Sequence, residues 1–345
     1  MSDEKEPRFE KRAYAFKIKG RRNRLTCQSG GAFTALAEAL IEKGWIIYGV
    51  AYEKPYAVYE RITEKVDLKR LRGSKYVQAK AKDVFRKLEN DLKTNDRNVL
   101  FSGTPCMTAA AKRYCEVRGI RTERLLTIEF LCHGVTSPKL FSYYLDYTEK
   151  QQGFTSKDFV FRDKTVNGWG GYYSKFKINR LVSKVSENWL LIFRADRYFR
   201  ESCFKCKYAS TQRGADITIS DFWSIRRTDK RFGDINGVSM ILINSAKAAE
   251  NISIFADRGG VLQVPLDSII QPPMEHPTFY RGDGLEIDWQ RKSFGENARL
   301  IMEHYSRKDT LLFCGIPITL RGRFWKEFLS ANIKSYFAMI KGLWR

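Results

Sequence analysis

The chain has 345 residues, 43% of them hydrophobic, and a formal net charge of +22, so it is long enough for two domains or one large one with a buried core. The first residues are charged, and no run reaches the roughly 18 apolar residues of a membrane-spanning helix, so we expect neither a secretory signal nor a transmembrane segment. The expected compartment is the cytoplasm, where the seven cysteines are thiols or metal ligands rather than disulfides.

Helix and strand signals alternate in the first half of the chain, after a basic segment that we expect to form a loose arm over residues 1–25. The expected elements are helix 32–43, strand 45–52, helix 83–93, strand 98–101, helix 106–118, strand 125–131 and helix 139–151. Thr104-Pro105 and Ser137-Pro138 each combine an N-cap residue with a proline at the first helical position. This alternation predicts an α/β domain over residues 26–152 with a largely parallel sheet.

The pattern changes near residue 153, where short strand-like runs begin. They cover residues 159–161, 176–178, 216–219 and 238–244. We expect an α+β portion over residues 153–318. In the last segment, residues 319–345, aromatic and aliphatic side chains recur at helical spacing among basic ones. This predicts a basic amphipathic helix that either docks on its own domain or lies on an anionic membrane surface.

Four cysteines give the strongest chemical signal. Cys106 and Cys132 each follow a predicted strand, and Cys203 and Cys206 form a Cys-x-x-Cys. Open α/β sheets bind ligands outside the carboxyl ends of their strands, so Cys106 and Cys132 share an edge if their strands are neighbours. Four converging thiolates hold an iron–sulfur cluster or a zinc ion, and the spacing does not choose between them. The alternative for Cys106 and Cys132 is that they are small buried hydrophobic residues.

Two short segments have features of nucleotide-binding loops. Gly30 and Gly31 precede the first expected helix, where free backbone N–H groups can approach a phosphate, although a plain helix cap is the commoner explanation. Residues 72–78 combine small, cationic and aromatic side chains, suited to a nucleotide or a flavin, with a solvated loop as the alternative. His133 follows Cys132 directly and could donate a proton or satisfy a backbone carbonyl.

The positive charge is compatible with nucleic acid, an acidic membrane surface, or anionic cofactors and redox proteins as partners, or with a solvated basic surface. No named nucleic-acid motif accompanies the basic residues, so we do not expect nucleic acid as the partner.

Together these motifs resemble one family, the coenzyme F420 hydrogenase/dehydrogenase beta-subunit family of flavin iron–sulfur oxidoreductases. The matching stretches are residues 28–36, 71–78, 101–106, 132–135, 161–164, 168–169, 202–209 and 216–223. Their joint occurrence in this order is specific, whereas no single stretch would be.

The resemblance implies FAD and a [4Fe-4S] cluster, with electrons passing between the cluster and a two-electron acceptor through the flavin. The implied cluster ligands are Cys106, Cys132, Cys203 and Cys206. The implied FAD contacts are Gln28, Ser29, Gly30, Gly31, Thr34, Arg72, Ser74, Lys75, Tyr76 and Gln78.

The chain departs from the family pattern in three places. Many members carry an N-terminal ferredoxin-like segment with clustered cysteines, whereas only Cys27 precedes the glycine turn here, so we expect electrons from a separate protein. Met107 stands in place of the family's usual Gln after the first ligand. Ser220 and Ser224 replace the two glycines of the family's Gly-Asp-Phe-Trp-Gly. The departures concern the acceptor more than the cluster.

We therefore expect a cytoplasmic flavin iron–sulfur oxidoreductase. Its donor would be a ferredoxin-like protein or a hydrogenase/dehydrogenase subunit, and its acceptor a small molecule that takes two electrons. His133 and Glu129 are candidates for proton relay, and Lys75 for tuning the flavin. Some relatives stand beside polysaccharide-assembly enzymes, which adds a link to polysaccharide assembly and, through the tail, to the inner face of the cell membrane. The alternative is a non-catalytic accessory protein with a metal site of four cysteines that binds a membrane surface or nucleic acid.

Overall fold

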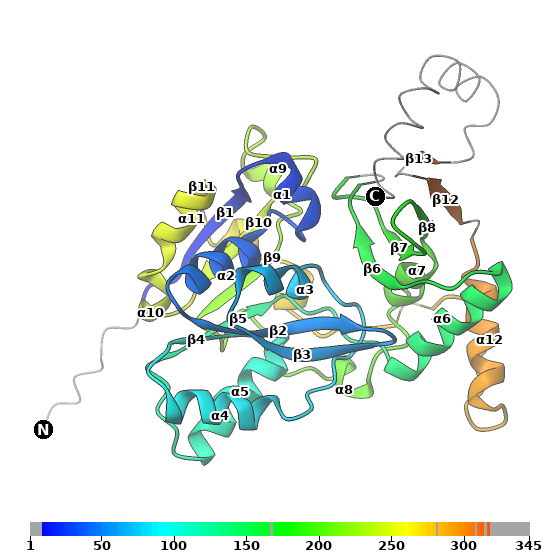
Figure 1. Cartoon of the computed structure of the whole chain (residues 1–345), viewed down its shortest axis with the longest axis horizontal. Coiled ribbons are helices and arrows are strands. Elements are labelled where there is room, and N and C mark those ends of the chain that lie inside the picture. The colour runs from blue at the N-terminus through cyan, green and yellow to red at the C-terminus, as the bar shows by residue number, and fades with distance from the viewer. Residues whose placement is uncertain (1–8, 166–167, 281, 308, 314–315, 318–345) are drawn as a thin grey trace, which may run out of the picture.

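Two β-sheets organise the chain, one of eight strands and one of five (Figure 1). The computed structural model describes residues 9–165, 168–280, 282–307, 309–313 and 316–317. The amphipathic helix predicted over residues 319–345 lies outside the described residues, so it stays a prediction. No helix of the described part combines the length and hydropathy that crossing a bilayer requires.

Strands and helices alternate through the first half, and short elements follow. The strands are β1 (Arg12–Ile18), β2 (Ile46–Glu53), β3 (Tyr56–Ile62), β4 (Val99–Gly103), β5 (Leu125–Phe130), β6 (Asp158–Asp163), β7 (Tyr173–Lys177), β8 (Val182–Ser186), β9 (Ile217–Asp221), β10 (Ser239–Ile243), β11 (Gly259–Val264), β12 (Thr310–Phe313) and β13 (Ile316–Pro317). The α-helices are α1 (Arg21–Thr26), α2 (Ala32–Glu42), α3 (Leu68–Leu71), α4 (Val84–Thr94), α5 (Pro105–Val117), α6 (Pro138–Gln152), α7 (Asn188–Arg194), α8 (Glu201–Phe204), α9 (Ile225–Thr228), α10 (Ala246–Ala249), α11 (Ile252–Arg258) and α12 (Phe294–His304). Three 3-10 turns, η1 (Lys65–Asp67), η2 (Asp267–Ile269) and η3 (Pro272–Met274), complete the set.

The eight-stranded sheet has a parallel centre and antiparallel flanks. Its strand order is β11-β1-β10-β9-β5-β4-β2-β3. The four central strands β9, β5, β4 and β2 pair in parallel. Every pairing outside them is antiparallel. The central β5 is buried on both faces, as expected of a parallel strand covered by helices.

Helices cover both faces of this sheet. On one face α2 and α11 bury Leu36, Leu40 and Phe255 against the strands. On the other face α4 and α5 bury Leu88 and Ala111. Figure 1 shows these two layers above and below the strands. The predicted α/β class with a parallel core is therefore confirmed.

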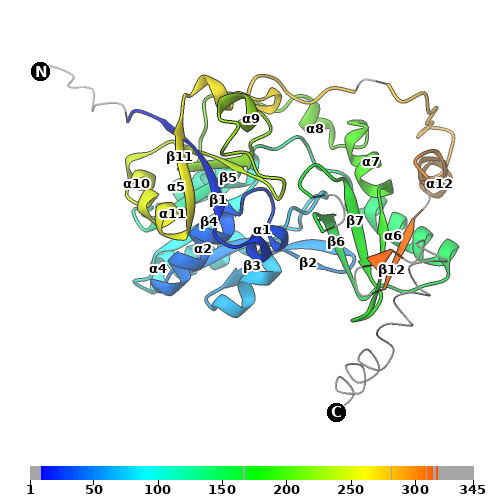
Figure 2. The ribbon, with the colours of Figure 1, turned by 90° about the horizontal axis from the view of Figure 1, so that it is seen from above.

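The five-stranded sheet, β13-β12-β8-β7-β6, is antiparallel throughout and packs with α6, α7 and α12 around an aromatic core. It stands at the carboxyl end of β2, where the ring of Tyr52 lies 6.1 Å from that of Phe141 and 5.4 Å from that of Phe161. Figures 1 and 2 show β2 running from the large sheet toward β6 and α6. The carboxyl edge of the parallel strands therefore faces the second sheet.

The sequence predicted the helices at 32–43, 83–93, 106–118 and 139–151 within one residue at each end, and these are confirmed. The loose arm over residues 1–25 is wrong in its described part, because Arg12–Ile18 forms β1 between β10 and β11 and buries residues 13–16. The division at residue 152 does not follow the sheets. β9, β10 and β11 come from beyond it, yet they extend the sheet that contains β2, β4 and β5.

Candidate redox site at the carboxyl edge of the sheet

Cys106 and Cys132 lie at one edge of the large sheet, as the sequence predicted. β4 and β5 are parallel neighbours, and their register pairs Gly103 with Glu129. Thr104 and Pro105 then open α5, which puts Cys106 in its first turn with Sγ 3.2 Å from Thr104 Oγ1. Cys106 is exposed, whereas Cys132 is partly buried.

The Cys-x-x-Cys segment is tied to the loop that follows Cys132. Thr136 of that loop forms an antiparallel bridge with Phe199. The N–H of Arg200 donates to Val135 O at 3.1 Å, and α8 begins at the next residue. This pairing holds α8, which contains Cys203 and is followed by Cys206, beside the loop that carries Cys132.

The four thiols lie within electrostatic reach of one another. Burial, and then the neighbouring Cys106, raise the pKa of Cys132 to about 12, and Cys203 and Cys206 act in the same direction. No group of three or more His, Cys, Asp or Glu side chains in the described part is arranged to hold a single metal ion. The donor set fits a cluster by its chemistry, because an iron–sulfur cluster is held by four thiolates whose mutual repulsion the iron relieves.

His133 stands on the same loop, exposed, with Nε2 2.6 Å from Asp196 Oδ1. Its ring packs against the rings of Phe193 and Phe199 at 6.2 and 5.8 Å. The imidazole therefore has a carboxylate partner that orients it next to Cys132.

Glu129 is 1% exposed and belongs to a buried polar cluster. Its Oε1 accepts from Arg213 Nε at 2.5 Å and from Thr218 Oγ1 at 3.0 Å, and Oε2 accepts from Thr108. Both oxygens of the carboxylate are thus engaged by a buried guanidinium and two hydroxyl groups, which favours a structural role over the proton relay expected from the sequence.

Lys75 caps a helix. Its Nζ donates to the carbonyls of Arg70, Leu71 and Arg72 at 3.3, 3.1 and 2.9 Å, at the end of α3. Burial lowers the pKa of Lys75 to about 7. The side chain is thus committed to the backbone of its own loop.

The glycine turn is packed against the protein itself. A Cβ on Gly30 would overlap Phe16 O and lie 2.5 Å from Ser239 N, and Gly31 has a φ of +88°. The N–H of Gly30 donates to Ser239 Oγ at 2.9 Å, and Ser29 Oγ donates to Val238 O at 2.7 Å. The close approach that requires glycine is therefore made by β1 and β10, not left open for a phosphate.

The loop at residues 72–78 lies beside the loop that follows Cys132. Thr136 Oγ1 donates to Tyr76 O at 3.0 Å, and the N–H of Gln78 donates to Thr136 O at 3.1 Å. Thr136 is four residues from Cys132 and also pairs with Phe199. One residue therefore joins three of the segments that the sequence singled out.

Arg162 of β6 links the predicted flavin segments. Its Nη1 lies 2.7 Å from Asp221 Oδ2 and 3.5 Å from the hydroxyl of Tyr76, and its carbonyl accepts from Gln28 Nε2 at 3.1 Å. Its Nη2 donates to Trp169 O at 2.5 Å.

The indole of Trp169 completes this cluster. Its Nε1 donates to Asp221 Oδ1 at 2.7 Å, and its ring stacks on Trp223 at 4.5 Å. These side chains lie in stretches that carried the family resemblance, but no role was expected for them individually. The sequence signal that could have identified Arg162 and Asp221 as buried polar residues is a charged residue flanked by apolar ones on a short strand.

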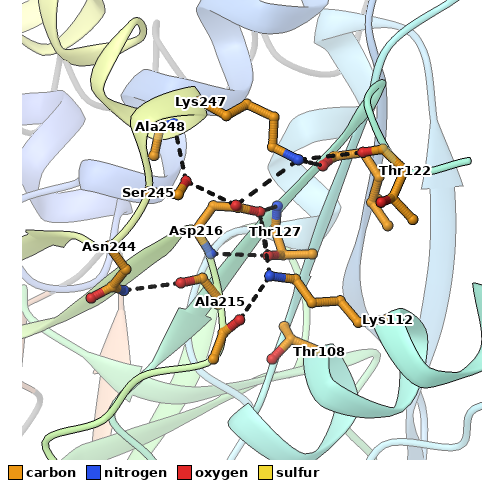
Figure 3. A network of polar contacts seen from close by, with 12 residues as sticks. Thr108, Lys112, Thr122, Thr127, Ala215, Asp216, Asn244, Ser245, Lys247 and Ala248 are labelled. Atoms are coloured by element: carbon orange, nitrogen blue, oxygen red, sulfur yellow. Dashed lines mark hydrogen bonds and ion pairs between the residues drawn. The ribbon is translucent and has the colours of Figure 1, made fainter. Parts of the chain in front are cut away.

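Asp216 anchors a second polar network, at the amino end of β9 and thus at the opposite edge (Figure 3). Its Oδ2 accepts from the N–H and Oγ1 of Thr127 at 2.8 and 2.6 Å, and its Oδ1 accepts from Ser245 Oγ at 2.9 Å. Lys112 and Lys247 approach the carboxylate at 3.8 and 3.9 Å. Asp216 is 5% exposed, so the network holds β5, β9 and α10 together rather than forming a site.

Comparison with known proteins identifies the family. A family model for the C terminus of the coenzyme F420 hydrogenase/dehydrogenase beta subunit matches residues 96–268, which is half of the chain. A chain of the F420-reducing [NiFe] hydrogenase complex from Methanosarcina barkeri, studied by xenon derivatisation, has a similar fold, with a TM-score of 0.51 and 14% identity over 88% of this chain and 91% of that one. No curated protein matches. The chain therefore belongs to the coenzyme F420 hydrogenase/dehydrogenase beta-subunit family.

Proposed function

We propose that this oxidoreductase-family protein passes electrons between a one-electron donor protein and a two-electron acceptor, using a [4Fe-4S] cluster and FAD. The observation that supports the proposal is that Cys106 and Cys132 follow the parallel neighbours β4 and β5, while the segment leading to Cys203 and Cys206 pairs with the loop after Cys132. When bound, the cluster would exchange single electrons and the FAD would pair them. The protein itself would position the two cofactors, exclude water from them and set the charge around them.

The cysteines span a range of exposure. Cys106 is exposed in the first turn of α5, whereas Cys132 is partly buried behind it. The exposed Cys106 would hold the cluster where a donor protein can approach it. The solved structure with a similar fold comes from a hydrogenase complex, which supports a separate donor subunit as the partner of this chain.

The FAD would be held by residues of the segments that contact the loop after Cys132. Tyr76 and Gln78 bind Thr136 of that loop, and Arg162 links Tyr76 to Gln28. The flavin contacts expected from sequence are thus adjacent to the cysteines. Of these contacts, Ser29, Gly30, Gly31 and Lys75 already bind the protein's own backbone, so Gln28, Arg72, Tyr76 and Gln78 are the stronger candidates.

His133 would exchange protons with solvent beside the cluster, with Asp196 orienting its imidazole. The acceptor would be a small molecule that takes two electrons. A link to polysaccharide assembly and a position at the inner face of the membrane remain part of the proposal through the family resemblance alone.

The experiment that tests the proposal is a visible spectrum of anaerobically purified protein before and after dithionite. Flavin and cluster both absorb visible light and both bleach on reduction. The matched variant is Arg72→Met, which should weaken FAD retention while the cluster absorbance stays. A protein with no visible absorbance, even after reconstitution with iron, sulfide and FAD, contradicts the proposed function.

A further inference from the structure

Lys164 is a buried cation without a carboxylate partner. The residue is 3% exposed, and its Nζ donates to Ser29 O at 2.8 Å and to Asn236 O at 2.7 Å. None of the ion pairs in the described part of the chain includes it. Burial lowers the pKa of Lys164 to about 8. The ammonium form still predominates at neutral pH, but by a smaller margin than for an exposed lysine.

The charges around Lys164 sum to an excess of one positive charge. Arg162 pairs with Asp221 at 2.7 Å, and Arg24 pairs with Asp234 at 3.3 Å. Both arginines act electrostatically on Lys164. Asp221 also acts on Lys164, but it is the ion-pair partner of Arg162, and Asp234 is that of Arg24, so no carboxylate is left for the ammonium of Lys164 alone.

Cys27, another neighbour of Lys164, is engaged by a different side chain. Its thiol donates to Thr34 Oγ1 at 3.1 Å. Buried charges are normally paired, and a bound anion would complete this site.

Two polar atoms beside this charge also lack partners. Arg162 Nε and Gln28 Oε1 are both buried without a hydrogen bond. The two residues are in contact, because Gln28 Nε2 donates to Arg162 O at 3.1 Å. One hydrogen-bond donor and one acceptor without partners thus lie beside the positive charge of Lys164. A ligand that fits them carries an acceptor, a donor and a negative charge.

We propose that Lys164, Arg162 and Gln28 bind the dioxopyrimidine edge of a flavin or deazaflavin ring and favour its reduced, anionic form. This edge offers carbonyl oxygens to Arg162 Nε and an N–H to Gln28 Oε1. The oxidised ring takes up two electrons, supplied by the donor protein, and one proton from solvent, which leaves one negative charge for Lys164 to balance. The inference rests on the proposed function, since it requires such a ring in the protein.

Two aromatic rings, those of Tyr172 and Trp223, separate the guanidinium of Arg162 from solvent. Its Cζ is 5.5 Å from the ring centroid of Tyr172 and 5.2 Å from that of Trp223. Tyr172 is partly exposed, and Trp223 is 46% exposed. A planar ligand would reach the buried donor by taking the place of one of these rings.

The test is the midpoint potential of the bound flavin, measured by anaerobic spectroelectrochemistry on the holoprotein. Lys164→Met should lower the potential by about 30 mV or more, which for two electrons is a tenfold loss of affinity for the reduced ring relative to the oxidised ring. Lys164→Arg keeps the charge and should restore the potential. Lys177→Met, at an exposed lysine of β7, is the matched control and should leave it unchanged.

Further measurements distinguish a flavin from a deazaflavin and keep the test valid if a variant does not fold. If a deazaflavin occupies the site, Lys164→Met should instead raise the ratio of its reduced to oxidised dissociation constants about tenfold, with the FAD potential unchanged. Gln28→Glu, which cancels the excess charge from a partly exposed position, should act in the same direction if Lys164→Met does not fold. A wild-type protein that binds neither ring overturns the proposed function and this inference together. A bound ring whose redox equilibrium ignores both substitutions overturns the inference alone.

Discussion

Replacing Asp216 by alanine should destabilise the protein by about 3–5 kcal/mol without touching the cofactor edge, because it breaks a buried charged network. The carboxylate accepts three side-chain or backbone hydrogen bonds, two from Thr127 and one from Ser245. Hydrogen bonds to a charged group contribute about 1.5–3 kcal/mol each, but losses within one network do not add fully. Lys112 and Lys247 are 40% and 36% exposed, so each ion pair adds only about 0–1 kcal/mol.

The effect of Asp216 should depend on pH with a definite sign. Burial alone would raise the pKa of Asp216, but Lys112, Thr127 and Lys247 outweigh it and hold the pKa below its usual value. Because the pKa is lower in the folded than in the unfolded chain, the carboxylate stabilises the fold above pH ~4. This contribution is lost as the pH falls through the folded-state value.

The assay is equilibrium urea unfolding of wild type, Asp216→Ala and Asp216→Asn at pH 7 and pH 3.5. The matched control is Asp257→Ala, at an exposed position in α11. Asp216→Asn should lose less, about 1–2 kcal/mol, because the amide oxygen still accepts from Thr127. A loss below about 1 kcal/mol for Asp216→Ala, or the same difference from wild type at both pH values, would refute this reasoning.

Two other substitutions test the structural roles assigned to expected site residues. Gly30→Ala should destabilise by about 1–3 kcal/mol or more, since its Cβ would meet Phe16 O and Ser239 N, whereas Gly214→Ala meets open space and should be neutral in a thermal melt. If Gly30→Ala instead keeps its melting temperature and loses FAD, the turn is a phosphate site after all. Glu129→Gln should lower the free energy of unfolding by about 3–5 kcal/mol, because it leaves the buried guanidinium of Arg213 without a negative counter-charge. A stable Glu129→Gln variant with slowed electron transfer would instead support proton relay as the role of Glu129.

The parallel core and the cysteine edge could be predicted because their signals are local. Thr104-Pro105 and Ser137-Pro138 mark the starts of α5 and α6 through capping chemistry that acts within one turn. Parallel strands then bring Cys106 and Cys132 to one edge by geometry alone.

The parts that could not be predicted depend on contacts between distant segments. β1 sits among charged residues and is a buried strand only because β10 and β11, more than 220 residues later, pair with it. Sequence alone would place Lys164 at the surface, yet it is buried by its bonds to Ser29 and Asn236, which are 135 and 72 residues away. The burial of a charged side chain is a property of the assembled fold, so composition and spacing carry no trace of it.

The amounts of iron and acid-labile sulfide per chain show whether the four cysteines hold one iron–sulfur cluster. The anaerobically purified protein should contain about four of each. Alanine at Cys106, Cys132, Cys203 or Cys206 should each remove most of them, while Cys115→Ala, in the buried core between α5 and the sheet, should not. Full iron content in Cys132→Ala, or stoichiometric zinc in place of iron, would contradict the account.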